Sequence, residues 1–254
     1  MRITFLGTGT SQGVPVIACN CDTCKSDDPR DKRLRTSLMV ETDDLIIVID
    51  AGPDFRQQML RENVTRLDAI FLTHEHKDHI AGMDDVRAFN YKTRDAIDIF
   101  AEERVQRAVQ KEYSYVFAEV RYPGVPKMRL NDIPTHEFVF RGLKVVPVRA
   151  YHRTLPIYGF RIGDFAYITD ADSVPKESKD LLFGVKYLVI NALRKEKHIS
   201  HFNLQEAIGF IMEVSPRQAF LTHVSHQMGI YSEISGKLPD GILLAYDGLK
   251  VTLE

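Results

Sequence analysis

The sequence predicts an α/β protein with α+β features, in which mixed β-sheets are covered by helices. Short apolar stretches that suit strands alternate with helical patterns along the whole chain. Several of these stretches are joined by tight turns, which favours antiparallel pairing inside otherwise parallel sheets. The chain has 254 residues and shows no internal repeat, low-complexity segment or linker, so we expect one domain over residues 1–254.

The chain opens with a predicted strand over residues 2–6, which leads into a glycine-rich loop over residues 7–13. This loop invites comparison with the dinucleotide-binding pattern G-x-G-x-x-G. Its third glycine, Gly13, falls one residue too late and no helical pattern follows it, so we reject that interpretation.

The elements that follow are short. Residues 37–41 and 45–49 are predicted to be paired strands around an Asp43-Asp44 turn. A helix is expected over residues 53–62, and a longer helical pattern covers residues 102–117.

The second half of the chain continues the alternation. A helix is predicted over Leu204–Val214, with Asn203 as its N-cap because a short polar side chain can accept a hydrogen bond from the first turn. Two closing strands within residues 242–253 are expected around Asp247-Gly248, a turn typical of hairpins. The remaining strands are predicted over residues 145–148, 157–162, 165–169 and 218–221.

The overall composition excludes several classes of protein. Hydrophobic residues make up 44% and charged residues 27%, which is ordinary for a globular chain, and the net charge is −2. Without a basic bias, a large nucleic-acid partner is not expected. The N-terminal apolar run is too short for a signal peptide, and no apolar stretch approaches membrane-spanning length. We therefore expect a cytoplasmic protein with no membrane partner.

The most informative segment is His74-Glu75-His76-Lys77-Asp78-His79, an H-x-H-x-D-H pattern that follows a predicted buried strand over residues 67–73. Imidazole and carboxylate are the ligands that borderline divalent metals prefer. The chain has nine histidines, and three of them fall in this hexapeptide, which favours a metal site over a charged surface loop. His74 and His76 fit one metal, while Asp78 and His79 fit a second metal beside it.

Three more candidate ligands each stand at the carboxyl end of a predicted apolar strand: His152, Asp170 and His223. Taken singly, each is a weak signal, because an aspartate after a strand is usually a turn residue. Together with the hexapeptide they supply seven ligands for two metals, and the carboxylate of Asp170 could bridge both.

The three cysteines of the chain are clustered as Cys19-x-Cys21-x-x-Cys24. An odd number of cysteines in a cytoplasmic chain is a poor basis for disulfides, so a thiolate metal site is the better interpretation. Tetrahedral zinc would need a fourth ligand from elsewhere in the chain. Plain reduced thiols are the alternative.

The ligand pattern, in this order and at these separations, resembles that of the metallo-β-lactamase fold. Three further segments resemble the PhnP branch of that family, the phosphoribosyl cyclic phosphodiesterases of phosphonate breakdown. These segments are the glycine-rich loop with its continuation to Pro15, the cysteine cluster, and Ile49-Asp50-Ala51-Gly52-Pro53-Asp54-Phe55-Arg56-Gln57-Gln58. The resemblance covers essentially the whole chain.

The resemblance implies a four-layer αβ/βα sandwich and a distribution of the ligands. It places His74, His76 and His152 on one metal. It places Asp78, His79 and His223 on the other, with Asp170 between the two. It also implies a separate structural zinc held by the three cysteines and a late histidine, which His226 matches. A surface or supporting role is the alternative for His226.

The expected function is a phosphodiesterase that acts on a small cyclic phosphate or phosphodiester, such as 5-phosphoribosyl 1,2-cyclic phosphate. Two divalent metals, zinc or manganese, would share a bridging hydroxide as the nucleophile. By resemblance, His201 is the catalytic histidine that protonates the leaving group. Histidine in general suits this task, because a free imidazole exchanges its proton near neutral pH. His198 could be its pair partner or merely exposed. Asp78 could also shuttle protons, and Asp50 is expected to orient the ligand loop by hydrogen bonds.

Other functions stay open on the same fold. A ribonuclease Z-like nuclease, a lactonase or a thioesterase could use the same metal site. A non-catalytic metal-binding partner is a further alternative, for which a broken ligand set would be the mark. The expected partner is a small-molecule phosphodiester substrate, and a homodimer is the default assembly because dimers are the commonest oligomers.

Overall fold

The computed structural model describes residues 1–120 and 122–254. The contacts between residues divide the chain into two compact units. Unit 1 contains Met1–Gly7, Arg35–Ile133 and Gly248–Glu254, and unit 2 contains Thr8–Leu34 and Pro134–Asp247. Each unit has a mixed seven-stranded sheet and its own helices, which confirms the predicted fold class. The single domain over residues 1–254 stays a prediction.

The sheet of unit 1 is antiparallel on one side and parallel on the other. Its strands, in spatial order, are β14 (Lys250–Thr252), β1 (Arg2–Gly7), β2 (Ser37–Glu41), β3 (Ile46–Ile49), β4 (Ala69–Phe71), β5 (Ile97–Ala101) and β6 (Met128–Asp132). The parallel pairing runs from β3 to β6. The carboxyl ends of β3 and β4 therefore lie at the same edge of this sheet.

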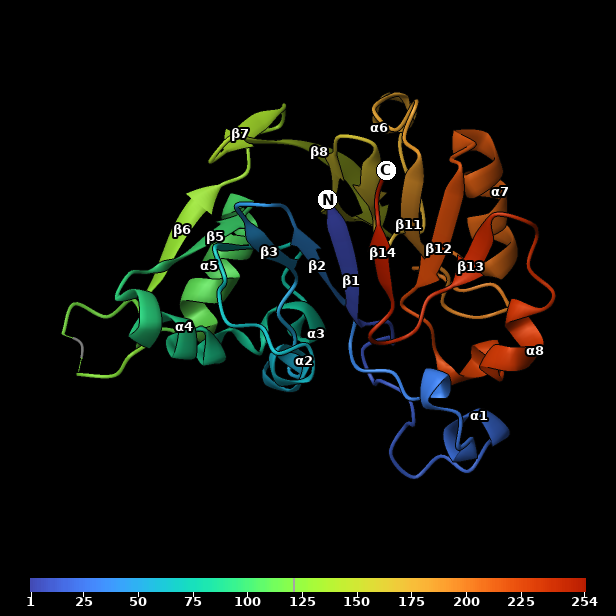
Figure 1. The fold of residues 1–254 in the computed structure, drawn as a ribbon, viewed down its shortest axis with the longest axis horizontal. Helices are drawn as coiled ribbons and strands as arrows, with labels where there is room; N and C mark the ends of the chain where they lie inside the picture. The colour runs from blue at the N-terminus through green and yellow to red at the C-terminus, as the bar shows by residue number, and fades with distance from the viewer. Residues whose placement is uncertain (121) are drawn as a thin grey trace. The chain divides into compact units, whose positions relative to one another are not determined.

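The helices of unit 1 pack on an apolar face of this sheet (Figure 1). The core joins Val48 and Ile70 of the sheet with Phe55 and Val105 of the helices, and all four side chains are buried. The helices are α2 (Phe55–Arg61), α3 (Lys77–Ile80), α4 (Arg87–Thr93) and α5 (Glu103–Glu112), with a 3-10 turn, η2, at Met83–Val86.

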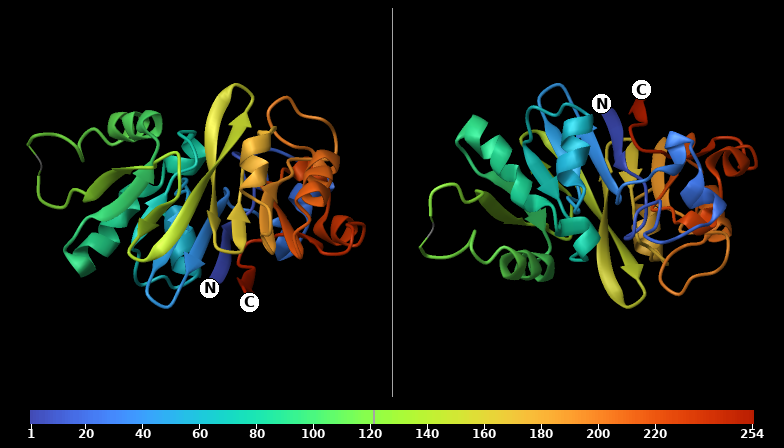
Figure 2. Two further views of the ribbon diagram at one scale, coloured as in Figure 1. Left: turned by 90° about the horizontal axis from the view of Figure 1, so that it is seen from above. Right: turned by 90° about the horizontal axis from the view of Figure 1, so that it is seen from below.

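The sheet of unit 2 has the same division into an antiparallel and a parallel part. Its strands, in spatial order, are β13 (Ile242–Leu244), β12 (Gln218–Thr222), β11 (Tyr187–Asn191), β10 (Phe165–Tyr167), β9 (Leu155–Ile162), β8 (Leu143–His152) and β7 (Phe138–Phe140). Strands β8 and β9 form a long hairpin, drawn in yellow in Figure 2. The parallel part, β10 to β13, brings the carboxyl ends of its strands to one edge.

The helices of unit 2 are mostly short. Helix α7 (Leu204–Val214) begins where the sequence predicts, because Asn203 accepts a hydrogen bond from the backbone of Glu206 while the Glu206 carboxylate bonds back to the Asn203 amide. The others are α1 (Asp22–Lys25), α6 (Lys176–Asp180) and α8 (Tyr231–Ser235), with 3-10 turns η1 (Pro29–Asp31) and η3 (His226–Met228).

The two closing strands and the helix predicted over residues 102–117 differ from the sequence prediction. The closing strands form, but not as a hairpin, because β13 pairs with β12 in unit 2 and β14 pairs with β1 in unit 1. Helix α5 ends at Glu112, earlier than predicted. The next residue, Tyr113, turns its hydroxyl into unit 1, where it donates to Ile80 O at 2.7 Å and accepts from Met83 N at 3.1 Å.

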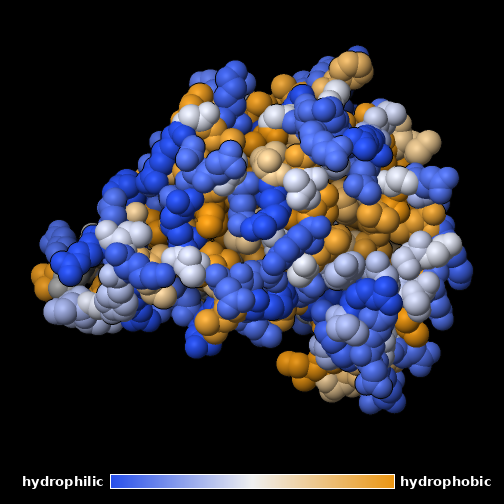
Figure 3. Space-filling model, viewed as in Figure 1, coloured by the Kyte–Doolittle hydropathy of each residue, from blue (hydrophilic) through white to orange (hydrophobic). Residues whose placement is uncertain are grey.

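Among the helices of residues 1–120 and 122–254, none is long and apolar enough to cross a bilayer. Hydrophilic residues cover most of the face drawn in Figure 3, with hydrophobic residues between them. Scattered exposed apolar side chains of this kind are normal for globular proteins.

Candidate metal centre

The hexapeptide begins just beyond a strand end in unit 1. Strand β4 ends at Phe71, His74 follows three residues later, and the one-turn helix α3 begins at Lys77. The ring of His74 lies 4.6 Å from that of His76 and 4.2 Å from that of His79, measured between centroids. The Nε2 atom of His79 lies 3.2 Å from Oδ2 of Asp78. The loop and α3 thus bring together the four predicted ligands of unit 1.

Asp50, at the end of β3, fixes two of these histidines. Its Oδ2 accepts a hydrogen bond from His79 Nδ1 at 2.7 Å and another from the Thr73 hydroxyl at 2.9 Å. Because the Thr73 proton points at Asp50, the Thr73 oxygen accepts from His74 Nδ1, 2.9 Å away. Both Nδ1 atoms therefore carry protons, and each Nε2 keeps the lone pair that a metal needs. Burial raises the pKa of Asp50, while its bonds to His79 and Thr73 oppose that shift.

Close backbone packing holds the hexapeptide against β3. The amide of Ala51 donates to His79 O at 2.7 Å, and Gly82 N donates to Ala51 O at 2.9 Å. A Cβ on Gly52 would lie 1.9 Å from Asp78 O, and one on Gly82 would lie 1.9 Å from Gly52 O. Only glycine permits this approach at both positions, so the backbone sets the place of α3.

Unit 2 places its candidate ligands on separate strands. His152 is the last residue of β8, Asp170 follows β10, and His223 follows β12. The Nδ1 atom of His223 lies 3.0 Å from Asp170 Oδ2, and the Thr10 hydroxyl lies 3.1 Å from His223 Nε2. His152 Nδ1 lies 2.8 Å from the backbone oxygen of Asp170 and donates to it, which leaves Nε2 as the ligand atom.

An asparagine in β11 secures the turn that carries Asp170. The side-chain amide of Asn191 donates to Ala171 O at 2.9 Å, and its oxygen accepts from Ala171 N at 2.8 Å. Asn191 is fully buried. We call these two hydrogen bonds of Asn191 the Asn191 clamp, and the hydrogen bonds of Asp50 to His79 and Thr73 the Asp50 clamp. Each holds a ligand-bearing segment of its unit in place.

Three residues at these strand ends adopt left-handed backbone conformations. The φ angles are 63° at Asp50, 59° at Asp170 and 55° at His223. Such angles are uncommon outside glycine, and their clustering at functional sites is a general observation. Each lets the chain turn sharply at a strand end, so that the side chain stays at the edge of its sheet.

His201 lies with the ligands of unit 2. Its Nε2 is 3.1 Å from Asp170 Oδ1, and its ring is 4.6 Å from that of His152 and stacks at 5.0 Å on that of His223. His198 is not an isolated surface residue, since its Nδ1 lies 3.2 Å from His201 Nδ1. Burial is the main cause that lowers the pKa of His198, and the nearby His201 adds to it.

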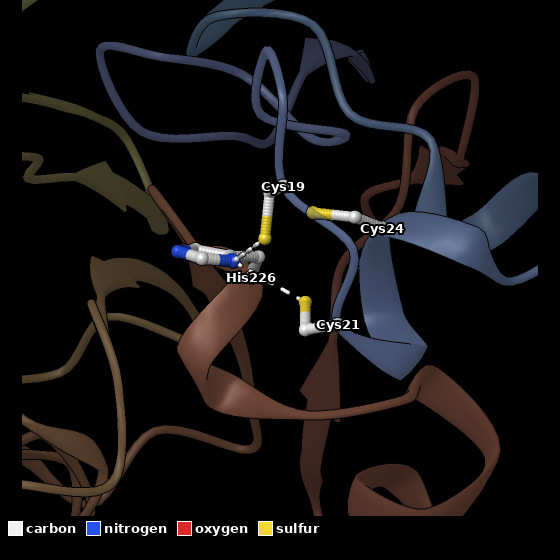
Figure 4. A group of neighbouring side chains, drawn as sticks. All are labelled: Cys19, Cys21, Cys24 and His226. Carbon is white, nitrogen blue, oxygen red and sulfur yellow. Dashed lines mark hydrogen bonds between the residues drawn. The ribbon is translucent and has the colours of Figure 1, made fainter.

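A second cluster in unit 2 gathers the three cysteines and His226 (Figure 4). The sulfur atoms of Cys19 and Cys21 lie 3.2 and 3.3 Å from His226 Nδ1. The four candidate ligand atoms, one each from Cys19, Cys21, Cys24 and His226, lie within 4.8 Å of one another. The set of three sulfurs and one nitrogen is a closed structural type that suits zinc.

The cysteines of this cluster differ in acidity. A backbone hydrogen bond from Cys24 is the main cause that lowers the pKa of the Cys21 thiol to about 6. Burial raises the pKa of the Cys24 thiol to about 11. Cys21 is exposed while Cys24 is buried, so Cys21 is the more reactive thiol in the absence of metal.

Several supporting residues were missed by sequence reasoning. Thr73 immediately precedes the hexapeptide, and a hydroxyl beside a ligand could have suggested its role. Thr10 stands in the glycine-rich loop, where Gly9 forms a bridge to Val224 beside His223. Asn191 ends a strand as the candidate ligands do, but nothing in its sequence context separates it from an ordinary strand residue.

The comparisons with known proteins agree with this geometry. Residues 46–224 match the family described as the beta-lactamase superfamily domain. The chain belongs to this family, and the two seven-stranded sheets and the histidine–aspartate groups place it among the metallo-β-lactamase-type hydrolases. Within the family, its structure is similar to that of a diphosphatase from the PhnP family, with a TM-score of 0.93 and 38% identity over 100% of this chain and 98% of that one. The predicted resemblance is confirmed.

Two more distant structures share the fold. Zn²⁺-bound PqqB from Methylobacterium extorquens has a TM-score of 0.79 at 19% identity, covering 100% of both chains. The short form of human tRNase Z has a TM-score of 0.71 at 19% identity, again over 100% of both chains. At this identity the likeness shows the fold alone.

The curated relatives are longer than the matched region. An octanoyltransferase of Porphyromonas gingivalis is 39% identical over 257 residues, which is 100% of this chain and 52% of that protein. A ribonuclease Z of Prochlorococcus marinus is 26% identical over 170 residues, which is 65% of this chain and 50% of that protein. About half the length of each relative is therefore covered.

Proposed function

We propose that the chain is a metal-dependent phosphodiesterase that hydrolyses a small cyclic phosphate or phosphodiester, with 5-phosphoribosyl 1,2-cyclic phosphate as the reference substrate. The observation that carries the proposal is the full-length similarity to a PhnP-family diphosphatase. In the hydrolysis of a diphosphate and of a phosphodiester, the oxygen of water attacks phosphorus and displaces an oxygen leaving group. The same kind of site can therefore serve both reactions. The proposed partner is accordingly a small molecule and not a nucleic acid.

The donor atoms fit divalent metals in both units. Imidazole nitrogens with carboxylate oxygens suit Zn²⁺ and Mn²⁺, and the hydrogen bonds at Nδ1 of His74, His79 and His152 prepare Nε2 for coordination. We propose the distribution of ligands that the family resemblance implies: His74, His76 and His152 for one metal, Asp78, His79 and His223 for the other, and Asp170 for both. When bound, the metals supply an activated water and polarise the phosphoryl oxygens.

The protein's own groups have separate tasks in this proposal. Asp50 holds the imidazole of His79 in one tautomer through a 2.7 Å hydrogen bond. His201 gives its Nε2 proton to the leaving oxygen, because this atom lies 3.1 Å from Oδ1 of Asp170, one of the proposed metal ligands. Asp78 accepts the proton released by the attacking water, in addition to binding metal.

The proposal is tested by hydrolysis assays on Mn²⁺- or Zn²⁺-loaded protein. The panel contains ribose 1,2-cyclic phosphate, 2′,3′-cyclic nucleotides, an aryl phosphodiester, a diphosphate, a precursor tRNA and a lactone. We expect cleavage of the cyclic or aryl diesters, and its loss in Asp170→Ala. The matched control is Asp180→Ala, which removes an exposed carboxylate from α6 in the same unit. Equal activity of the two variants would contradict the proposed site.

A ribonuclease Z-like activity is the second candidate, favoured by the 26% identity to curated ribonucleases Z over 65% of this chain. Cleavage of the precursor tRNA without cleavage of the small diesters would establish it in place of the first proposal. Lactone cleavage alone would favour a lactonase or thioesterase. If the protein hydrolyses no substrate in the panel, a non-catalytic metal-binding role is favoured.

The cysteine cluster is proposed to hold a structural zinc. Cys19, Cys21, Cys24 and His226 leave no open position for substrate. Metal analysis tests this: we expect one zinc per chain that persists in Asp170→Ala and is lost in Cys21→Ser. A Cys21→Ser protein with unchanged zinc content would overturn the assignment.

A further inference from the structure

We propose that His198 and Ser200 are positioning residues for His201, which fix its Nδ1 as a hydrogen-bond donor so that Nε2 is the atom that delivers the proton. This inference rests on the proposed function and deepens it, because it assigns roles to two residues next to the proton donor. All the groups involved belong to unit 2.

The three side chains form a closed triangle of polar atoms. The Ser200 hydroxyl lies 3.0 Å from His201 Nδ1 and 3.2 Å from His198 Nδ1, and the two Nδ1 atoms are 3.2 Å apart. The rings of the two histidines are 5.2 Å apart and tilted. Ser200 is 7% exposed, so its hydroxyl depends on these neighbours for hydrogen bonding.

One further contact orders the protons in this triangle. The backbone amide of Ser200 donates to His198 Nδ1, in a long bond of 3.4 Å. An amide can only donate, so His198 Nδ1 is an acceptor and its own proton lies on Nε2. His201 Nδ1 faces that acceptor and must therefore carry the proton between the two rings. The Ser200 oxygen, 3.0 Å from His201 Nδ1, accepts from the same proton.

Because Nδ1 of His201 donates to His198 and Ser200, Nε2 is the ring nitrogen that can transfer a proton to the substrate. Nε2 lies 3.1 Å from Asp170 Oδ1, at the group of proposed metal ligands. In the proton transfer, the Nε2–H bond breaks and an O–H bond forms on the leaving alkoxide. The imidazolium becomes a neutral imidazole that keeps its Nδ1 proton on the His198–Ser200 pair. Proton number and charge balance without any further reactant.

The backbone around the triangle is held independently. Phe202 N donates to Ala171 O at 2.8 Å, and Leu193 N donates to Phe202 O at 3.0 Å. The Phe202 ring stacks on that of Phe210 at 5.8 Å. Removing the side chain of His198 therefore leaves the segment in place but takes away one of the two partners that hold His201 Nδ1. This separation makes a positioning role distinguishable from a purely structural one.

The test compares leaving groups. Nitrophenolate leaves without a proton, whereas an alkoxide needs one. We would measure kcat/KM for methyl phosphate diesters with 4-nitrophenyl, phenyl and benzyl leaving groups, using the metal-loaded full chain. For His198→Ala we expect a loss of about tenfold or more on the benzyl ester, in line with groups that orient a functional residue, and a much smaller loss on the nitrophenyl ester.

Two companion variants sharpen the result. His198→Asn keeps an acceptor that can stand near the Nδ1 position, so it should restore most of the benzyl activity. Ser200→Ala should reproduce the selective loss, and it replaces His198→Ala if that protein fails to fold. The matched control is Ile199→Ala, between the two, whose side chain is 73% exposed and should give the wild-type ratio.

The possible outcomes distinguish the positioning role of His198 from the phosphodiesterase proposal on which it rests. A selective loss on poor leaving groups, with rescue by His198→Asn, supports the positioning role. An equal loss on all three esters, or none, overturns it while leaving the phosphodiesterase proposal intact. A wild-type protein that hydrolyses no ester defeats the proposed function itself and the inference with it.

Discussion

The two units build their groups of candidate ligands in different ways. In unit 1, four ligands fall within six residues, carried by one loop and one helical turn. In unit 2, the ligands come from the ends of β8, β10 and β12, and the segment before α7 adds His201. One group is therefore local in sequence, and the other is assembled by the register of a sheet.

The difference shows which kinds of substitution should disrupt each group of candidate ligands. The local group depends on how closely α3 can approach β3, which glycines permit. The assembled group depends on turns at strand ends, which a side-chain clamp from β11 secures. Both use the same device of a buried polar side chain at a strand end, Asp50 in one unit and Asn191 in the other. We therefore expect backbone changes to damage unit 1 most, and losses of hydrogen bonds to act similarly in both.

The largest effect is expected for Gly52→Ala. The added Cβ would meet Asp78 O at 1.9 Å, and backbone cannot yield as a flexible side chain does. We expect loss of the active-site metals and a clear fall in Tm, measured by metal analysis and calorimetry. Gly209→Ala in α7 is the matched control, because its Cβ meets open space and alanine favours helix. Full metal content in Gly52→Ala would show that α3 is not held as described.

Asp50→Ala should follow in size. It leaves the Nδ1 atom of His79 and the Thr73 amide without their buried acceptor, and loss of such a partner typically costs about 10–100-fold in metal affinity or activity. Titration with Zn²⁺ in a competing chelator measures the affinity. Asp54→Ala is a useful comparison, since it removes a carboxylate that pairs with Arg35 in the same unit. Equal affinities of the two variants would count against the Asp50 clamp.

Asn191→Ala tests the corresponding clamp in unit 2. Two buried backbone groups of Ala171 lose their partner, at a cost of about 1–3 kcal/mol each in unfolding free energy. Because Asp170 directly precedes Ala171 in the chain, we also expect the Asn191→Ala variant to bind metal more weakly and to have a lower kcat. Urea unfolding and steady-state kinetics measure the two effects. If Asn191→Ala lowers the unfolding free energy but leaves kcat unchanged, the hydrogen bonds of Asn191 support the fold and do not position Asp170.

The smallest effect on activity concerns the cysteine cluster. In zinc-free protein, iodoacetamide should label Cys21 much faster than Cys24 at pH 7, because their thiol pKa values are about 6 and about 11. The sign follows from the thiolate being the nucleophile: labelling of Cys21 should fall as the pH drops through about 6. Peptide mass spectrometry measures the ratio, and added zinc should protect both thiols. Equal labelling rates would contradict the different environments of the two cysteines.

The local half of the site was the easier half to predict. His74 to His79 could be identified by residue type and spacing alone, and the helix over Leu204–Val214 by its cap and periodicity. His152, Asp170 and His223 each carry little signal alone, and they became candidates only through their shared place at strand ends and the hexapeptide beside which they were considered. His201 and His226 needed the family resemblance. The supposed hairpin at Asp247-Gly248 failed because turn chemistry is local, whereas the sheet that each closing strand joins is decided by distant partners.

The most direct test of the central claim is electron paramagnetic resonance of the Mn²⁺-loaded chain. If Asp170 is a ligand of both proposed metals, the wild-type protein should show an exchange-coupled pair of Mn²⁺ ions. Asp170→Ala should abolish the coupling, and Asp180→Ala should keep it. A wild-type spectrum of isolated Mn²⁺ ions only would contradict the proposed distribution of ligands and the mechanism built on it.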